Sequence, residues 1–142
     1  MDVPKPWHEV WMEVARVIAQ RSKDPSTKVG AVLVSPDQRQ VATGYNGFPK
    51  GIVENRSRWE RPAKYDYVVH AEQNAILNCV TDVSGWTLYC TLFPCKQCAK
   101  MIAQTGLDTV VVPANIGSKF SEIDTEFAEQ IFKEANVKLV RI

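Results

Sequence analysis

The stretch TLYCTLFPCKQCAKMIAQTGLDTVVV, residues 87–112, predicts a strand, a helix and a second strand in succession. Its two apolar, β-rich ends predict strands over 86–91 and 108–112, and the segment between them predicts a helix over 95–105. Pro94 suits the entry to that helix, where a missing backbone N–H costs little. Strands that alternate with helices indicate an α/β fold, in which helices cover a sheet.

The same alternation continues on both sides of this stretch. Residues 7–21 place apolar side chains at helical spacing and predict an amphipathic helix. Residues 28–45 predict a hairpin around a short turn, and this hairpin makes the sheet mixed rather than wholly parallel. The remaining expected elements are a helix over 70–79, a helix over 121–135 and a strand over 137–141.

Residues 50–67 are polar and show no periodicity, so we expect a long loop there. A loop of that length inside a compact domain is more often functional than idle.

Length and composition indicate one soluble domain, residues 1–142, of ordinary globular composition with 45% hydrophobic residues. No apolar run approaches the length that spans a bilayer, and we expect a cytoplasmic protein, in the host cytoplasm if a phage encodes it. The net charge of +1 speaks against binding of a nucleic-acid polymer, because that function normally needs a clustered surplus of Lys and Arg.

Cys95 and Cys98 are the first candidates for a chemical role. The four cysteines of the chain allow two disulfides, but an intracellular protein more often uses a close pair for metal binding or catalysis. Residues three apart on a helix share a face, and a helix start favours the thiolate that binds zinc. His70 also stands at a helix start, so these three side chains can meet and leave one zinc position open, as in catalytic sites.

Glu72 lies two residues after His70 and can reach a metal-bound water. By itself, His-Ala-Glu is more often an ordinary core histidine beside an acid. The pair Cys95 and Cys98 is also compatible with a redox site or a zinc ribbon. A redox site, however, does not need the distant His-Ala-Glu. A zinc ribbon normally contains another close pair of Cys or His residues.

The chain resembles the zinc-dependent cytidine and deoxycytidylate (dCMP) deaminase family. The pattern His-x-Glu followed by Pro-Cys-x-x-Cys is shared with the wider group of nucleobase deaminases. Blocks similar to those of dCMP deaminases, in the same order, are RSKDPSTKVGAVLV (21–34), GYNGFP (44–49), YDYVVHAEQNAI (65–76) and TLFPCKQCAK (91–100).

This resemblance implies a three-layer α/β/α fold with a five-stranded mixed sheet. It implies one catalytic Zn²⁺ per chain, held by His70, Cys95 and Cys98, and Glu72 as the proton shuttle. The implied reaction is hydrolysis of dCMP to dUMP with release of ammonia, which supplies dUMP for thymidylate synthesis. Zinc would lower the pKa of its water, and the resulting hydroxide would attack C4 of cytosine.

The substrate contacts are predicted from the same blocks. Asn46 resembles the deaminase asparagine that hydrogen-bonds the sugar, although it could also be a turn residue in a left-handed conformation. Ala71 is also expected to contact the substrate. Arg21, Ser22 and Lys23 offer a cradle for the 5′-phosphate, or else the solvated end of a helix.

The family resemblance also implies a homo-oligomer, a hexamer, activated by dCTP and inhibited by dTTP, with Mg²⁺ accompanying the triphosphates. The alternative is that the charged loop over 50–67 has no effector role, because a charged loop is more usually just solvated. The expected effector contacts are Gly44, Tyr45, Asn46, Gly47, Phe48, Lys50 and Arg58.

Cys79 and Cys90 are predicted to be core thiols that behave as small hydrophobic residues, so we expect no second zinc. Three other functions stay open: a tRNA adenosine deaminase, a cytidine deaminase acting on free nucleosides, and a non-catalytic nucleotide-binding protein with a structural zinc. The intact Glu72 argues against the last.

Overall fold

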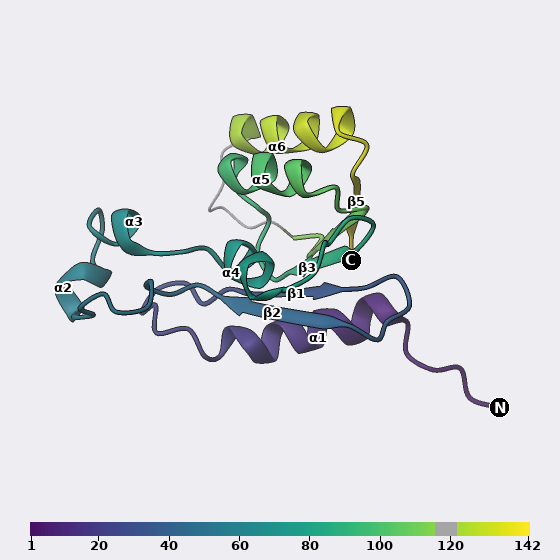
Figure 1. The fold of residues 1–142 in the computed structure, drawn as a ribbon, viewed down its shortest axis with the longest axis horizontal. Helices are drawn as coiled ribbons and strands as arrows, with labels where there is room; N and C mark the ends of the chain where they lie inside the picture. Colours follow the sequence, from purple (N-terminus) through teal and green to yellow (C-terminus); the bar gives the residue numbers. More distant parts are fainter. Residues whose placement is uncertain (116–121) are drawn as a thin grey trace.

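The computed structural model describes residues 1–115 and 122–142, and its centre is a five-stranded sheet with strand order β2-β1-β3-β4-β5 (Figure 1). Strand β1 is antiparallel to both β2 and β3, whereas β3, β4 and β5 run parallel. The predicted mixed sheet is confirmed. The strands are β1 (Gly30–Val34), β2 (Val41–Tyr45), β3 (Thr87–Cys90), β4 (Thr109–Val112) and β5 (Lys138–Arg141).

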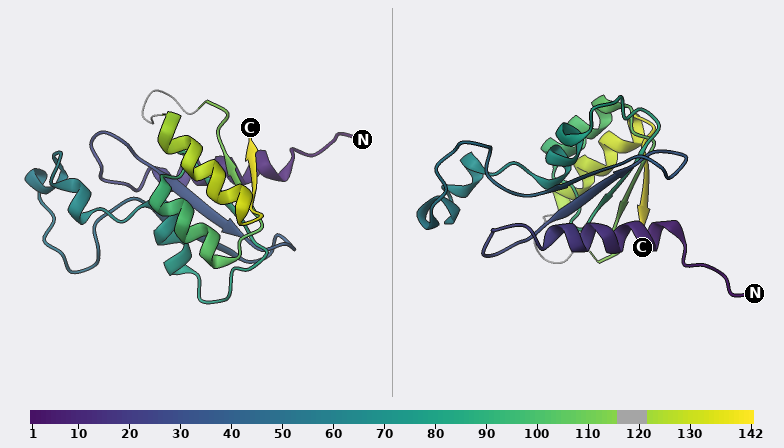
Figure 2. Two further views of the ribbon diagram at one scale, coloured as in Figure 1. Left: turned by 90° about the horizontal axis from the view of Figure 1, so that it is seen from above. Right: turned by 60° about the horizontal axis from the view of Figure 1, so that its bottom comes forward.

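Helices cover both faces of this sheet, which confirms the predicted three layers. Of the helices in the described residues, α1 (Trp7–Ala19) lies on one face, while α4 (Ala71–Asn78), α5 (Lys96–Thr105) and α6 (Glu122–Glu134) lie on the other (Figure 2). Each face has its own apolar core: Met12 and Ala15 pack on Val32, Val34 and Tyr89 beneath α1. Strands β1 and β4 are buried at every position because helices cover them on both sides.

Glycine allows α4 to lie directly on β2. A Cβ at Gly44 would come within 2.3 Å of the backbone nitrogen of Ala75 and 2.4 Å of the carbonyl oxygen of Ala71. The amides of Asn74 and Asn78 donate to the carbonyls of Tyr45 and Thr43, each at 2.8 Å. Since β2 is an edge strand, these two bonds occupy carbonyls that another chain could otherwise pair with.

The expectation of a loop over residues 50–67 is wrong in part. Two single-turn helices, α2 (Arg56–Trp59) and α3 (Lys64–Tyr67), interrupt it, at the end of the molecule opposite the N-terminus (Figure 1). Asn55 starts α2, because its side-chain oxygen accepts the backbone N–H of Arg58 at 3.0 Å. Helices this short show no apolar period, so the sequence pattern could not predict them.

The other predicted elements are confirmed with small changes at their ends. The first helix ends at Ala19 rather than at residue 21, and His70 and Cys95 stand at the N-caps of α4 and α5 rather than inside them. Position 121, the expected start of the last long helix, lies outside the described residues. Among the described helices, none is long and apolar enough to cross a membrane.

Candidate metal and catalytic site

Two helix starts meet at one edge of the sheet and bring the predicted ligands together. His70 is the N-cap of α4, and the side-chain oxygen of Gln73 accepts its backbone N–H at 3.0 Å, which fixes the helix start. Cys95 is the N-cap of α5, and its sulfur accepts the backbone N–H of Cys98 at 3.5 Å. Both side chains therefore project from rigid backbone.

The ligand atoms of His70, Cys95 and Cys98 lie within 4.8 Å of one another. His70 Nδ1 is 3.2 Å from Cys98 Sγ and 3.6 Å from Cys95 Sγ. Tetrahedral zinc with bonds of about 2.1 Å to nitrogen and 2.3 Å to sulfur separates neighbouring ligands by about 3.5–3.8 Å. The group is thus of the right size and chemistry for Zn²⁺, and three protein ligands leave one position for a water.

The electrostatics of this group favour the thiolate at Cys95 and the protonated thiol at Cys98. Hydrogen bonds from Cys98 and His70 lower the pKa of the Cys95 thiol to about 4. The hydrogen bond to Cys95, followed by burial, raises the pKa of Cys98. The hydrogen bond to Cys95 and the charge of Glu72 raise the pKa of His70. A divalent cation at this point would displace these protons, since metal-bound thiols are deprotonated.

Glu72 lies in the first turn of α4 and only 5% of it is exposed. Burial raises the pKa of its carboxyl, although the nearby His70 opposes this. One carboxylate oxygen, Oε1, is 3.9 Å from His70 Nδ1, and the other, Oε2, accepts the thiol of Cys90 at 3.2 Å. A buried carboxyl of this kind exchanges a proton more readily near neutral pH than an exposed one.

The two remaining cysteines differ from each other. Cys90 is fully buried, as predicted, but it does not behave as a small hydrophobic residue, because its thiol faces the carboxylate of Glu72. Cys79 is only partly buried and lies within 3.6 Å of the carbonyl oxygen of Thr81 at the end of α4. The sequence positions of both cysteines predict burial. The partner of Cys90 depends on the packing of α4, which carries Glu72, against β3.

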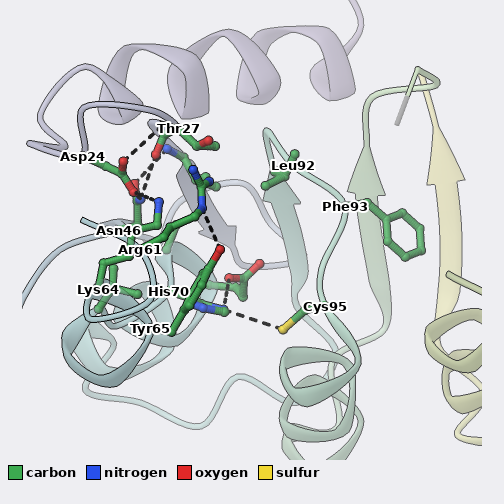
Figure 3. A pocket seen from close by; sticks show the side chains of 14 residues that line it. Asp24, Thr27, Asn46, Arg61, Lys64, Tyr65, His70, Leu92, Phe93 and Cys95 are labelled. Atoms are coloured by element: carbon green, nitrogen blue, oxygen red, sulfur yellow. Dashed lines mark hydrogen bonds and ion pairs between the residues drawn. The ribbon is translucent and has the colours of Figure 1, made fainter. Parts of the chain in front are cut away.

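A pocket opens onto this group and is also lined by residues from other segments of the chain (Figure 3). His70, Ala71, Glu72 and Cys95 form its inner end. Val29 and Leu92 contribute apolar side chains to the lining, and polar side chains lie together as one wall of the pocket (Figure 3). These polar residues are Asp24, Asn46, Arg61, Lys64 and Tyr65.

Asp24 is the centre of a buried polar network in this wall. It accepts the ammonium of Lys64 at 2.9 Å and the amide of Asn46 at 3.3 Å. It also accepts the backbone N–H groups of Ser26 and Thr27, at 2.9 and 3.1 Å. Burial acts to raise the pKa of Asp24, but these hydrogen bonds together lower it. No local pattern indicates the pairing of Asp24 with Lys64, because the two residues are 40 positions apart in the chain.

Arg61 is a further residue of this wall that the sequence pattern does not indicate as part of the site. Its Nε donates to the hydroxyl of Tyr65 at 2.6 Å, and both residues are largely exposed at the pocket (Figure 3). Because Lys64 is already paired with Asp24, Arg61 carries the guanidinium that remains available to an anion in the pocket. A short helical turn after Pro62 brings it there, and such a turn has no periodic signal.

Asn46 lines the pocket, but its amide is already engaged. The side-chain oxygen accepts the backbone N–H of Val29 at 2.8 Å, and the side-chain nitrogen donates to the carbonyl of Thr27 at 2.9 Å as well as to Asp24. Among the described residues other than glycine, only Gln38 and Asn136 have positive φ, so the alternative of a left-handed Asn46 is wrong. The residue joins the end of β2 to the segment before β1.

The predicted phosphate cradle of Arg21, Ser22 and Lys23 does not line this pocket. Ser22 is buried, and its hydroxyl donates to the carbonyl of Asn46 at 2.9 Å, so it is an internal structural group. Lys23 is exposed and forms an ion pair with Glu54 at 3.3 Å. Lys23 instead lines a separate, shallow hollow with Glu54, Asn55 and Arg56.

The predicted effector residues are spread over several environments. Gly44 is buried against α4, as described above. Phe48 stacks on Trp59 with ring centroids 4.3 Å apart, and the guanidinium of Arg58 lies 4.5 Å from the ring centre of Tyr67. Tyr45 and Lys50 are exposed, and Gly47 pairs with Val69 in an isolated β-bridge.

The fold and this site define a class of protein: hydrolytic, zinc-dependent nucleobase deaminases, whose pattern is His-x-Glu with Pro-Cys-x-x-Cys. Residues 5–114 match the family described as the cytidine and deoxycytidylate deaminase zinc-binding region. The chain belongs to this family.

Relatives within the family are substantially similar. The deoxycytidylate deaminase of Mus musculus is 43% identical over 139 residues, which cover 92% of this chain and 76% of that protein. The deoxycytidylate deaminase of Homo sapiens is 42% identical over 132 residues, covering 88% of this chain and 72% of that one. A crystal structure of the dCMP deaminase from cyanophage S-TIM5, in complex with dCMP and dUMP, superposes with a TM-score of 0.77 at 29% identity, over 99% of this chain and 100% of that one.

Proposed function

We propose that this protein hydrolyses dCMP to dUMP and ammonia. The observation that carries the proposal is the position of Glu72, a buried carboxylate 3.9 Å from His70 in the same pocket as Cys95. The names of the relatives support the nucleotide substrate, since they are deoxycytidylate deaminases and one solved relative contains dCMP and dUMP.

His70, Cys95 and Cys98 would hold one zinc ion per chain. Bound there, zinc supplies Lewis acidity that lowers the pKa of a coordinated water from its value in bulk solvent toward about 7. The hydrogen bond that the backbone N–H of His70 donates to Gln73, and the one that the backbone N–H of Cys98 donates to the sulfur of Cys95, keep these ligands oriented for the ion. The proposal predicts a stoichiometry of one zinc per chain.

Glu72 would carry the protons of the reaction. It accepts a proton from the attacking water as the water oxygen bonds to C4 of cytosine, and delivers that proton to N3. It then takes the remaining proton of the hydroxyl formed on C4 and transfers it to the C4 amino nitrogen, which leaves as ammonia when the C4–N bond breaks and the C4 oxygen becomes the carbonyl of uracil. The overall change is dCMP plus water to dUMP plus ammonia. The raised pKa of the buried carboxyl suits both steps near neutral pH.

Substrate recognition would use the rest of the pocket. Val29 and Leu92 would contact the faces of the base, and Ala71 lines the pocket beside the two ligand-bearing helix starts. We assign the 5′-phosphate to Arg61 rather than to Arg21, Ser22 and Lys23, because Arg61 lines this pocket and those three residues do not. A guanidinium offers a phosphate two parallel hydrogen bonds. Asn46 would hold the wall in shape, with the second lone pair of its carbonyl oxygen open to a sugar hydroxyl.

The wider role we propose is supply of dUMP for thymidylate synthesis, by a cytoplasmic hexamer that dCTP activates and dTTP inhibits. Support for a regulatory site is the shallow hollow beside α2, lined by the cations Lys23 and Arg56 and the carboxylates of Glu54 and Glu60. Cations pair with phosphates, and Mg²⁺ in proteins is typically held by one or two carboxylates together with phosphate oxygens. This hollow adjoins the turn that contains Phe48, because Phe48 stacks on Trp59 in its lining.

The test of the activity is ultraviolet detection of turnover of dCMP and deoxycytidine by zinc-analysed protein, with Glu72→Gln beside Glu60→Gln as the matched acid-to-amide control. We expect Glu72→Gln to keep one zinc and lose turnover by roughly 10²–10⁴-fold, the usual contribution of a general acid–base residue. Absence of dCMP turnover by the zinc-loaded wild type would contradict the proposed reaction. Substantial activity in Glu72→Gln would remove that residue from its role.

The test of regulation is the same assay with dCTP or dTTP in the presence of Mg²⁺, together with sedimentation to give the oligomer size. We expect opposite effects of the two triphosphates and loss of both in Arg56→Gln. Unchanged kinetics in the wild type would contradict the regulatory proposal while leaving the deamination proposal intact.

A further inference from the structure

The carboxylate of Glu72 has a close partner outside the metal-binding group. Cys90 is the last residue of β3, is completely buried, and its Sγ lies 3.2 Å from Oε2 of Glu72. A carboxylate without its proton accepts hydrogen bonds only, so the thiol is the donor in this contact.

The two oxygens of Glu72 face different groups. Oε2 is directed to Cys90, whereas the ion-pair contact to His70, at 3.9 Å, is made by Oε1. A residue that moves protons to several atoms of one substrate must keep its carboxylate in one orientation, because a misplacement of about 1 Å is costly in rate. Anchoring Oε2 removes the rotation that would turn Oε1 away.

Cys90 is suited to keep this contact when the site is loaded. Cys95 and Cys98 would bind zinc as thiolates and would then have no hydrogen to donate. Cys90 lies outside the group of ligand atoms formed by His70, Cys95 and Cys98. Burial and the charge of Glu72 raise the pKa of Cys90 well above its usual range, so its sulfur keeps a proton.

We propose that Cys90 is a positioning residue for the reaction, whose thiol fixes the carboxylate of Glu72 with Oε1 toward the metal and the substrate. This inference rests on the proposed function, because it assigns Glu72 the proton transfers. It adds a residue of β3 to a site otherwise built from the starts of α4 and α5.

The experiment uses three variants of Cys90 in the zinc-loaded protein. Cys90→Ala and Cys90→Val both remove the donor, one by making the side chain smaller and one by making it larger, so a loss common to both reports on the donor rather than on volume. Cys90→Ser keeps a donor. Cys79→Ala is the matched control, because Cys79 contacts the carbonyl of Thr81 and not Glu72.

We expect Cys90→Ala and Cys90→Val to lower kcat roughly 10–100-fold, as for loss of a hydrogen bond to a charged group. KM for dCMP, the affinity for dUMP and the zinc content should stay within about twofold, because the donor acts on orientation. Cys90→Ser should recover most of kcat, and Cys79→Ala should equal the wild type. An unchanged kcat in both donor-free variants, or parallel losses of kcat and zinc content, would overturn the inference.

A spectroscopic measurement tests the contact without activity. The S–H stretching band of Cys90 is identified as the band that is present in the wild type and missing in Cys90→Val. A hydrogen bond from the thiol to a carboxylate lowers the frequency of this band. We expect this band to shift upward in Glu72→Leu. The same frequency in both proteins would overturn the inference. A wild type that has the shifted band but no dCMP turnover would contradict the proposed function and leave the contact standing.

Discussion

The ammonium of Lys64 lies 2.9 Å from the carboxylate of Asp24, and only 6% and 2% of these two side chains are exposed. Lys64 belongs to α3, and Asp24 follows α1, so this ion pair fastens the 50–67 segment to the body of the domain. Arg61 and Tyr65 are on the same segment and line the pocket. The buried pair therefore decides where the mouth of the pocket lies.

We predict that Lys64→Met lowers the free energy of unfolding by about 3–5 kcal/mol, because it leaves a buried carboxylate without its cation. Urea unfolding measures the effect. Lys23→Met is the control: the Lys23–Glu54 pair is exposed on the lysine side, and its loss should cost at most about 1 kcal/mol. Losses for Asp24→Asn and Lys64→Met that simply add in the double variant would show that the two side chains do not interact.

Stability should fall in acid through Asp24. Its pKa in the folded chain is lower than the ordinary value of 3.8, so its contribution is present above that pH and is lost as pH falls through the folded pKa. Urea midpoints measured from neutral pH down into this range should drop less steeply for Asp24→Asn than for the wild type. Identical slopes would mean that Asp24 titrates equally in the folded and unfolded chains.

Gly44→Ala should destabilise the protein by about 1–3 kcal/mol and lower its zinc content, because the added Cβ meets the backbone of α4, which carries Glu72 and is capped by His70. Gly47→Ala is the matched control, three residues along the same turn, where the nearest atom is 3.7 Å from the new Cβ. Thermal unfolding and metal analysis compare the two. Equal effects would mean that the approach of α4 to β2 is not the limiting contact.

Arg61→Gln should reduce kcat/KM for dCMP by about 10–100-fold and leave deoxycytidine turnover nearly unchanged, because only the nucleotide carries a phosphate. The matched variant is Lys23→Gln, outside this pocket, which should affect neither substrate in the absence of effectors. The reverse result, with dCMP turnover sensitive to Lys23 and insensitive to Arg61, would return the phosphate to the segment after α1.

Much of the site followed from local sequence because its key residues stand at helix starts. The ligands Cys95 and Cys98 are three residues apart, and the sequence around each helix start indicates where it begins. The five strands and the long helices were predictable for the same reason, since apolar period depends on nearby residues alone. The single-turn helices α2 and α3 were not, because four residues are too few to show a period.

Sequence by itself determined the residue types of the metal group, the order of the main elements and the mixed sheet. Tertiary structure alone decided that Cys90 faces Glu72, 18 residues away, and that Lys64 reaches Asp24, 40 residues away. It also decided that Arg61, and not Lys23, lines the pocket. The physical reason is that a hydrogen bond or an ion pair forms only between groups that packing brings within about 3 Å of each other. That packing depends on how each helix or strand lies on its neighbours. No local pattern of the chain specifies this arrangement.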